Sequence, residues 1–575
     1  MTASVASTRV RPLTAPRAVV DAPLVRTLAL LVGLGAALPV GYLVVRASDL
    51  GAAESWRILS SARTRELLAN TAVLVVAVSA ASTALAIPLA WLTARTDLPG
   101  RRWWTIATAL PLAIPSYVGS FAMIGALGPR GMVQGWLEPL GVDRLPSIYG
   151  FGGAFTVLTL FTFPYVLLPV RAAFRQLDPS LLEASRTLGA GPWGTFRRVV
   201  LAQIRPSVTA GALLVALYTL SDFGAVSMLR YDTFTRAIYT QYRGALNRNA
   251  AAVLGLALVA ITVVVLAAEQ RARQRQPTHR VHAGGGRLVP PTPLGRWRWP
   301  ATAICALVTT VALVLPMAVI GYWLWRGARV GEPLLPAGDL VMNTLVASGL
   351  GAGLTMLAAW PVALMVVRHP GRFTRLVERL SWAGYALPGI VVALSLVFVG
   401  ARHLPWLYQT LPMLVFAYAI LFLPQAIGPL RGSLLQITPS MEDASHVLGA
   451  SRVRTFWRIT FPLARPGVTA GVALVFLTCA KELPATLLLA PTEFGTLATR
   501  VWTASTEAFF ARAAAPALVL VLISAIPMML VVRREIDRRD PEPRPPGQAG
   551  ENATVIVPAA ETLTRSPRAT SGGPG

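Results

Sequence analysis

The feature that most constrains this chain is a series of apolar stretches long enough to cross a lipid bilayer. A bilayer-spanning helix needs about 20 consecutive, mostly apolar residues. About twelve stretches meet this requirement, at residues 25–45, 70–93, 104–126, 150–174, 206–229, 249–268, 300–323, 341–367, 380–400, 408–430, 466–490 and 512–532. Only 14% of the residues are charged, compared with ~25% in soluble proteins. The sequence therefore predicts an all-α, polytopic membrane protein.

The distribution of arginine indicates how these spans are oriented. The formal net charge is +26, and Lys481 is the only lysine, so nearly all positive charge is arginine. The arginines lie in alternate connecting segments, such as 94–103, 171–205 and 269–299, and not in one patch suited to nucleic acid. Because positive loops face the cytoplasm, we expect a multi-pass protein of the inner (cytoplasmic) cell membrane with both termini in the cytoplasm. The basic loop 230–248 opposes this assignment, but the other loops outweigh it.

The chain also contains an internal repeat. Residues 164–242 match 424–502 at an offset of 260, and Asn70-Thr71 matches Asn343-Thr344 at an offset of 273. Each half therefore holds six spans of the same design, and a pathway between two such halves is the expected use. The predicted segments are a cytoplasmic N-terminal tail at 1–24, a first half at 25–268, a cytoplasmic linker at 269–299, a second half at 300–532, and a disordered cytoplasmic tail at 533–575.

The best-matched part of the repeat joins the fourth and fifth spans of each half. Asp178-Pro179 and Thr438-Pro439 have the capping residue and first-position proline of a helix start. Gly189 and Gly449 follow about three turns later, where a left-handed residue commonly ends a helix. A second short amphipathic helix is expected after each glycine. The pattern predicts two helix–turn–helix knobs on the cytoplasmic side.

This pattern resembles the coupling loop of the permease subunits of binding-protein-dependent ABC importers. Glu183-Ala184-Ser185 with Gly189 matches its Glu-Ala-Ala and glycine, and so does Asp443-Ala444-Ser445 with Gly449. Phe461-Pro462 fits the Leu-Pro pair of the family, whereas the first copy departs from it with Leu201-Ala202. The resemblance implies a type I ABC importer fold in which the following residues contact or shape the ATPase interface: Glu183, Ala184, Gly189, Asp443, Ala444 and Gly449.

The resemblance also implies the partners. These are cytoplasmic ABC ATPase subunits, expected as a homodimer, an extracytoplasmic solute-binding protein and the lipid bilayer. A Walker A loop needs glycine-rich backbone and a lysine that reaches the phosphates, but Lys481 lies in an apolar run with no such loop before it. We therefore expect no cofactor in this chain, no enzymatic activity of its own, and ATP bound by a separate subunit.

Charged residues inside the spans are candidates for the transport pathway. The repeat places Asp222 opposite Glu482, so we hypothesise that both acids line the pathway or a gate, with Lys481 as a local counter-ion. The alternative is that the acids lie near the outer membrane boundary, solvated or ion-paired. Neither the histidines nor the cysteines have metal-ligand spacing. Asp222 and Glu482 remain candidate pathway ligands only.

Three segments are similar to the fused permeases of ferric-iron ABC importers: residues 221–226, 230–239 and 481–486. Ferric ion favours oxygen ligands, which Tyr231, Asp232 and Tyr239 could add to those of the two acids, although tyrosines near span ends more often form an aromatic belt. Thiamine and phosphonate permeases share the fused plan and stay open as alternatives. A secondary transporter driven by an ion gradient is the rival class, but it does not need duplicated knobs. The sequence lacks the HExxH and GxSxG signatures of a membrane-embedded enzyme.

Overall fold

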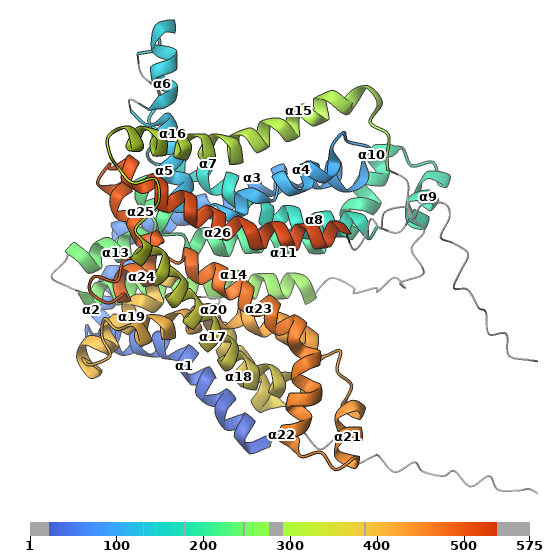
Figure 1. Cartoon of the computed structure of the whole chain (residues 1–575), viewed down its shortest axis with the longest axis vertical. Coiled ribbons are helices and arrows are strands. Elements are labelled where there is room, and N and C mark those ends of the chain that lie inside the picture. Colours follow the sequence, from blue (N-terminus) through green and yellow to red (C-terminus); the bar gives the residue numbers. More distant parts are fainter. Residues whose placement is uncertain are drawn as a thin grey trace, which may run out of the picture. The chain divides into compact units, whose positions relative to one another are not determined.

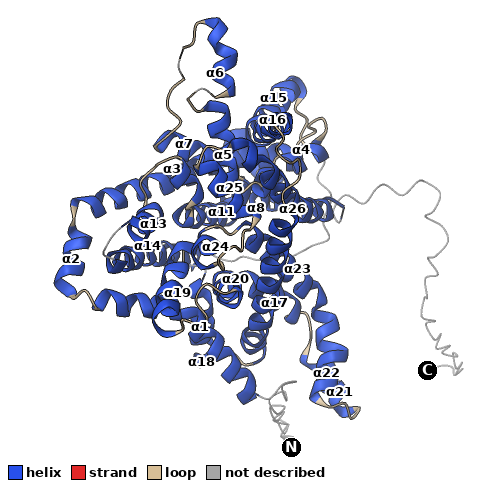
Figure 2. Cartoon of the chain, turned by 60° about the vertical axis from the view of Figure 1, so that its left-hand side comes forward, coloured by secondary structure: helices blue, strands red, loops and turns tan. Residues whose placement is uncertain are grey.

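The computed structural model describes residues 22–129, 131–143, 145–177, 179–244, 248–274, 291–384 and 387–537. Helix is the only regular secondary structure of the described part, apart from one isolated bridge between Thr96 and Thr292, and loops join the helices (Figure 2). The N-terminal tail, Asp178, most of the linker and nearly all of the C-terminal tail lie outside the described residues, so predictions for these segments remain predictions.

The helices follow the two halves of the repeat (Figure 1). The first half contains α1 (Ala22–Ser48), α2 (Ala52–Ser60), α3 (Ala62–Arg95), α4 (Arg101–Ala107), α5 (Ser116–Leu127), α6 (Met132–Leu137), α7 (Phe151–Thr162), α8 (Pro164–Arg175), α9 (Pro179–Thr187), α10 (Pro192–Thr195), α11 (Leu201–Ser221), α12 (Gly224–Met228), α13 (Phe234–Gly244) and α14 (Arg248–Gln274). The second contains α15 (Arg298–Thr309), α16 (Leu315–Arg329), α17 (Gly338–Arg368), α18 (Arg372–Ala383), α19 (Gly389–His403), α20 (Leu411–Leu434), α21 (Pro439–Val447), α22 (Arg452–Thr455), α23 (Phe461–Lys481), α24 (Pro484–Leu489), α25 (Leu497–Thr506) and α26 (Phe510–Asp537).

All twelve predicted stretches are helical, but not all of them are continuous spans. Within the described residues, 10 helices are long and apolar enough to cross a membrane, or up to 11 if one bent pair counts as a span. That pair, Arg101–Ala113 with Ser116–Gly135, bends by 98° at the third predicted span. The ninth is reduced to the short apolar helix α19. Uninterrupted helices were therefore the wrong prediction at these two places, where Pro115 and Pro388 each precede the new helix. Proline lacks the backbone donor and disfavours helix in the residue before it.

The fifth and eleventh predicted spans are interrupted as well. The long helices α11 and α23 end at Ser221 and Lys481, and the short helices α12 and α24 follow after a break of two residues. The breaks fall on Asp222 and Glu482, which are the two acids that the repeat placed opposite each other.

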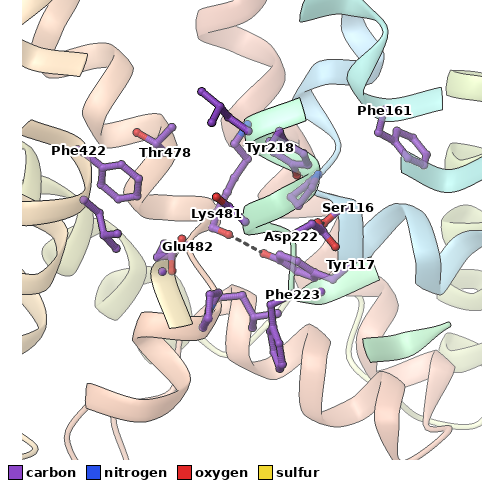
Figure 3. Close-up of a pocket in the computed structure, with 18 of the residues that line it drawn as sticks. Ser116, Tyr117, Phe161, Tyr218, Asp222, Phe223, Phe422, Thr478, Lys481 and Glu482 are labelled. Carbon is purple, nitrogen blue, oxygen red and sulfur yellow. Dashed lines mark hydrogen bonds between the residues drawn. The ribbon is translucent and has the colours of Figure 1, made fainter. Parts of the chain in front are cut away.

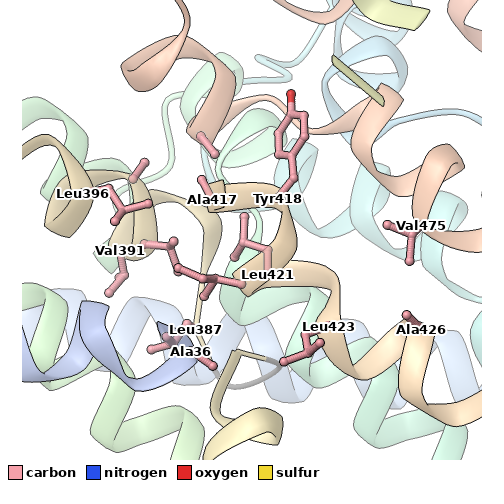
Figure 4. Packing of buried hydrophobic residues seen from close by; sticks show 14 of the residues in the cluster. Ala36, Leu387, Val391, Leu396, Ala417, Tyr418, Leu421, Leu423, Ala426 and Val475 are labelled. Atoms are coloured by element: carbon pink, nitrogen blue, oxygen red, sulfur yellow. The ribbon is translucent and has the colours of Figure 1, made fainter. Parts of the chain in front are cut away.

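The first span of each half packs into the core of the other half. Ala29, Ala36 and Leu43 of α1 are buried among residues of α17, α19 and α20 (Figure 4). Conversely, Cys305 of α15 and Ile320 of α16 are buried among residues of α5, α7 and α8. The halves were predicted from the sequence repeat, whereas each packed core combines helices from both repeats.

Candidate functional site

A cavity of about 250 Å³ lies between the two halves and is lined by both (Figure 3). The breaks in four spans meet at its wall, where Pro115 and Ser116 of the first half lie near Asp222, and Gly389 of the second lies near Glu482. Its polar lining comprises Ser116, Tyr117, Tyr165, Tyr218, Ser221, Asp222, Gln425, Thr478, Lys481 and Glu482. The structure therefore brings the three predicted gate residues together in one cavity.

Asp222 caps the short helix α12. Its Oδ1 accepts hydrogen bonds from the backbone N–H of Ala225 at 2.9 Å and of Val226 at 3.3 Å. Its Oδ2 accepts from the Ser116 hydroxyl, and its backbone carbonyl accepts from the Thr235 hydroxyl at 2.7 Å. A carboxylate at a helix N-terminus satisfies free N–H groups and interacts favourably with the helix dipole. Asp222 is only 6% exposed, and both its carboxylate oxygens accept hydrogen bonds within the protein. These bonds stabilise the break in the span.

Glu482 plays the same part in the second half with a different neighbour. Its Oε1 accepts from the N–H of Ala485 at 3.1 Å, and its carbonyl accepts from the Thr486 hydroxyl at 2.7 Å. Gly389 stands where the first half has Ser116, and a Cβ there would lie 2.5 Å from Oε1 of Glu482. The longer acid thus fills the space that the serine side chain fills in the first half. No hydrogen bond engages Oε2 of Glu482 among the described residues, which leaves this oxygen as the uncommitted carboxylate atom in the cavity.

Lys481 makes hydrogen bonds with the opposite half. Its Nζ lies 3.4 Å from the carbonyl oxygen of Leu112, and its own carbonyl accepts from the Tyr117 hydroxyl at 3.5 Å. Among the ion pairs of the described residues, none joins Lys481 to Asp222 or Glu482. The predicted counter-ion role is therefore not what the geometry supports, and Lys481 instead bridges the two halves.

An aromatic cluster that includes Phe223 of the cavity lining lies on the side remote from α9 and α21 (Figure 1). The ring centroids of Phe223 and Trp502 are 5.0 Å apart, and those of Phe223 and Tyr239 are 4.7 Å apart. Phe223 is 2% and Trp502 7% exposed. We call Phe223 and Trp502 the aromatic seal. Sequence reasoning missed Trp502, although it stands on α25 as Tyr239 stands on α13.

The equivalence of Tyr239 and Trp502 requires an offset of 263 instead of 260. The hydroxyl of Thr71 accepts from the N–H of Phe234 at 3.3 Å, and that of Thr344 accepts from Leu497 at 2.9 Å. These matched contacts show that the constant offset predicted for 164–242 fails beyond the short helices. The second half has three more residues there, partly because α24 is longer than α12.

The predicted knobs are present in both halves. We call 179–200 knob 1 and 439–460 knob 2; each contains two short helices (Figure 1). Gly189 and Gly449 have φ of 78° and 80°, which confirms the predicted left-handed turns. In both knobs the turn closes with two backbone bonds, from Ala190 to Ser185 and from Gly189 to Arg186 in knob 1, the pattern of a Schellman motif.

A hydroxyl pair braces each knob and leaves its tip exposed. Ser185 and Thr195 bond at 3.1 Å in knob 1, as Ser445 and Thr455 do at 2.9 Å in knob 2. Glu183, Ala184 and Gly189 are exposed, as are Ala444 and Gly449, while Asp443 is half-buried. Leu188 is 86% and Leu448 87% exposed. A braced turn that presents a leucine to solvent is suited to fit a groove in another protein.

Two further oxygen candidates, Tyr231 and Asp232, are not among the residues that line the cavity. The Asp232 carboxylate pairs with Arg63 at 2.5 Å and with Arg236, and the Tyr231 hydroxyl donates to the carbonyl of Asn70 at 3.2 Å. The pair between Asp232 and Arg236 neutralises part of the positive charge of the basic loop 230–248. Among the residues that the structure describes, no group of three or more His, Cys, Asp or Glu side chains could hold a metal ion.

Comparison with known proteins gives concordant results. The sequence family described as a binding-protein-dependent transport system inner membrane component matches residues 86–275 and again residues 351–534. The Fe(3+)-transport system permease protein FbpB 2 of Haemophilus influenzae is 36% identical over 514 residues, which is 88% of this chain and 97% of that protein. The ferric transport system permease protein FbpB of Actinobacillus pleuropneumoniae is 23% identical over 405 residues, covering 67% of this chain and 58% of that protein.

A smaller relative matches one part of the chain. The molybdenum transport system permease protein ModB of Azotobacter vinelandii is 33% identical over 166 residues, or 29% of this chain and 70% of that protein. The twofold family match agrees with the internal repeat and with the two knobs. The chain therefore belongs to the family of binding-protein-dependent transport system inner membrane components.

Proposed function

We propose that this chain is the two-half permease of an ABC importer that moves ferric iron from an extracytoplasmic binding protein into the cytoplasm. Separate ATPase subunits, acting as a homodimer, supply the energy. The observation that carries the proposal is the presence of two braced knobs together with a cavity that both halves line. In this arrangement the knob end faces the cytoplasm, with both termini, and the aromatic seal faces outward.

The knobs support the coupling step. Their short helices are joined to long spans through α8 and α11 in one half and α20 and α23 in the other. When ATP closes an ATPase dimer, two docked knobs move with it, and the attached spans reorient as rigid bodies. Leu188 and Leu448 at the tips supply the apolar contact that such docking needs.

The cavity supports the passage of cargo. Because Phe223 lines the cavity and packs against Trp502, both rings being buried on the side remote from the knobs, we infer that these rings close the outward end and that the described conformation is the inward-facing one. Asp222 is a structural cap whose oxygens are committed, so the direct contacts to cargo fall to Glu482, Lys481 and the hydroxyl and amide groups of the lining. A cavity with so few free ligands suits brief passage, whereas tight selection belongs to the binding protein.

The assignment of ferric iron rests on relatives. The permease of Haemophilus influenzae with 36% identity is named for Fe(3+) transport and spans nearly the same length. The relative named for molybdenum covers only 29% of this chain. Glu482 offers an oxygen ligand of the type that ferric ion favours.

Transport by the purified system tests the proposal. The chain is reconstituted in vesicles with its ATPase and binding protein and given ferric iron, thiamine or phosphonate in parallel. ATP-dependent uptake of iron alone is expected. Uptake of another cargo would overturn the iron assignment, and uptake that follows an ion gradient without ATP would overturn the importer class. A Leu188→Asp/Leu448→Asp variant is the control, because it should retain the cavity but no longer bind the ATPase subunits or take up cargo.

A further inference from the structure

The base of knob 2 contains a buried ionic junction. Glu442 is 3% exposed, and its Oε1 accepts from Arg368 at 3.1 Å and from the Thr460 hydroxyl at 3.0 Å. The same Arg368 nitrogen donates to the carbonyl of Ile437 at 3.1 Å. Arg368 is the last residue of α17, and Thr460 directly precedes α23. One carboxylate therefore ties together the first helix of the knob, the helix that leaves it, and α17.

Among the described residues, knob 1 has no such junction at the equivalent place. The repeat matches Glu442 to Leu182, Thr460 to Val200 and Arg368 to Arg95. Leu182 and Val200 pack with the apolar core of their half. Arg95 makes no side-chain hydrogen bond or ion pair within the described residues. Apolar contacts are non-directional, whereas a buried ion pair holds its partners in one geometry and is costly to break.

The other end of α17 holds the segment 495–506, here called the seal segment, which carries Trp502 of the aromatic seal. Near its N-terminus, Asn343 donates to the carbonyl of Gly495 at 3.0 Å, and Thr344 accepts from the N–H of Leu497 at 2.9 Å. Leu497 is the first residue of α25, which carries Trp502. With 31 residues, α17 extends over about 46 Å. One helix thus makes polar contacts with knob 2 at one end and with the seal segment at the other.

We propose that Arg368 and Glu442 are positioning residues that transmit the movement of knob 2 along α17 to the seal. The two halves are then mechanically unequal, since knob 1 is held to α3 without the ionic junction. This inference rests on the proposed function, because it takes an ATPase to move the knob. It adds that the second half links ATP hydrolysis to opening of the seal more tightly than the first.

The variant Glu442→Leu/Thr460→Val tests this role, because it gives knob 2 the residues that knob 1 already has. Uptake and ATP hydrolysis are both measured in vesicles with the ATPase and binding protein. The ratio of cargo moved to ATP hydrolysed should fall roughly fivefold, within the range by which residues between coupled sites modulate coupling. ATPase binding should not change, because the exposed tip is untouched.

Two further variants separate transmission from general stability. Glu378→Gln removes a different ion pair of the second half, between α18 and α20 at 2.9 Å, and should leave the ratio unchanged. Adding Leu182→Glu/Val200→Thr to the first variant gives Arg95 a partner and should restore part of the ratio. A merely local structural loss in knob 2 would not respond to a change in knob 1. If the first variant does not assemble, Glu442→Gln keeps the size of the side chain, and its ratio should also fall.

The outcomes distinguish the two proposals. Unchanged coupling in Glu442→Leu/Thr460→Val, while the native chain takes up cargo with ATP, would overturn the transmission role alone. Absence of ATP-driven uptake by the native chain would overturn the proposed function and the inference with it. A reduced ratio that is partly restored by the first-half substitutions would support both.

Discussion

Exchanging residues between the two broken spans tests whether two different pairs of side chains fill the same space in the two halves. The first half combines Ser116 with Asp222, and the second combines Gly389 with Glu482. We expect Gly389→Ser alone to be damaging, because its Cβ would lie 2.5 Å from Oε1 of Glu482 and 3.1 Å from Cγ of Pro484. The carboxylate can move away, but it then gives up its 3.1 Å bond to the N–H of Ala485.

The size of the effect follows from that cap. Losing a helix N-cap costs about 0.5–2 kcal/mol, and crowding a packed site adds about 1–3 kcal/mol. Because the crowding is partly relieved when the carboxylate moves, we expect a net loss of about 2 kcal/mol. Glu482→Asp in the same chain shortens the acid by one methylene and recreates the pair of the first half. The double variant should therefore recover most of the loss.

The measurement is a double-mutant cycle on the rate of thermal inactivation of ATP-driven uptake, with the reciprocal pair Ser116→Gly and Asp222→Glu as the matched control. Each double variant should outlast at least its more damaging single variant. If Gly389→Ser/Glu482→Asp is no more stable than Gly389→Ser, the two residues do not share one space, and the explanation of the divergence between the halves is wrong.

Three further predictions concern the turns, the seal and the seal segment. Gly449→Ala should weaken ATPase binding roughly tenfold in a pull-down titration, because an L side chain in the left-handed region costs about 1–2 kcal/mol. The cost is one of backbone conformation, since no atom lies within 4 Å of the new Cβ. Gly449→Asn should lose less affinity, because asparagine tolerates that conformation. Trp502→Ala should make dye-loaded vesicles leak small ions at rest, since it removes half of the aromatic seal, whereas Trp502→Phe should stay tight. Thr344→Val removes the acceptor for the N–H of Leu497 and should cost about 1–3 kcal/mol of stability, seen as faster thermal inactivation; an equal rate would show that water replaces the hydroxyl.

The sequence predicts the helical class, the repeat and the knobs because each depends on local chemistry. Apolar length determines the spans, and a glycine after about three turns marks the left-handed turn at Gly189 and Gly449. The breaks were not predictable from proline alone. Pro88, Pro206 and Pro361 lie inside continuous helices, while Pro115 precedes a sharp bend. Whether a membrane helix bends or breaks at a proline depends on whether neighbours satisfy the freed backbone groups. At these breaks the neighbours include an acid more than 90 residues away in the chain.

The sequence also did not predict that the first span of each half packs into the core of the other half. Helices in a bilayer are apolar on all sides, so their pattern does not say which face meets protein or which partner it meets. Tyr42 shows the consequence, since its hydroxyl donates to the carbonyl of Phe398 in the other half at 3.4 Å. The repeat places Asp222 opposite Glu482, and both line one cavity, but their contacts depend on packing that the repeat does not encode.

Differences between the halves carry as much information as their similarities. Where the copies agree, as at Ser185–Thr195 and Ser445–Thr455, both halves need the same rigid turn. Where they differ, they differ in sets, because a close-packed junction accepts a change in volume or polarity only if a neighbour compensates. At the broken spans, the first half packs Ser116 against Asp222 and the second packs Gly389 against Glu482. The acid caps the short helix in both halves, although the packed side chains differ. The replacement of Leu182 and Val200 by Glu442 and Thr460 is of another kind, since it adds an ionic contact that the described residues of the first half do not make at the equivalent place. We infer that compensated replacements of the first kind preserve a role that both halves share, whereas an added contact of the second kind indicates a role that belongs to the second half of the permease.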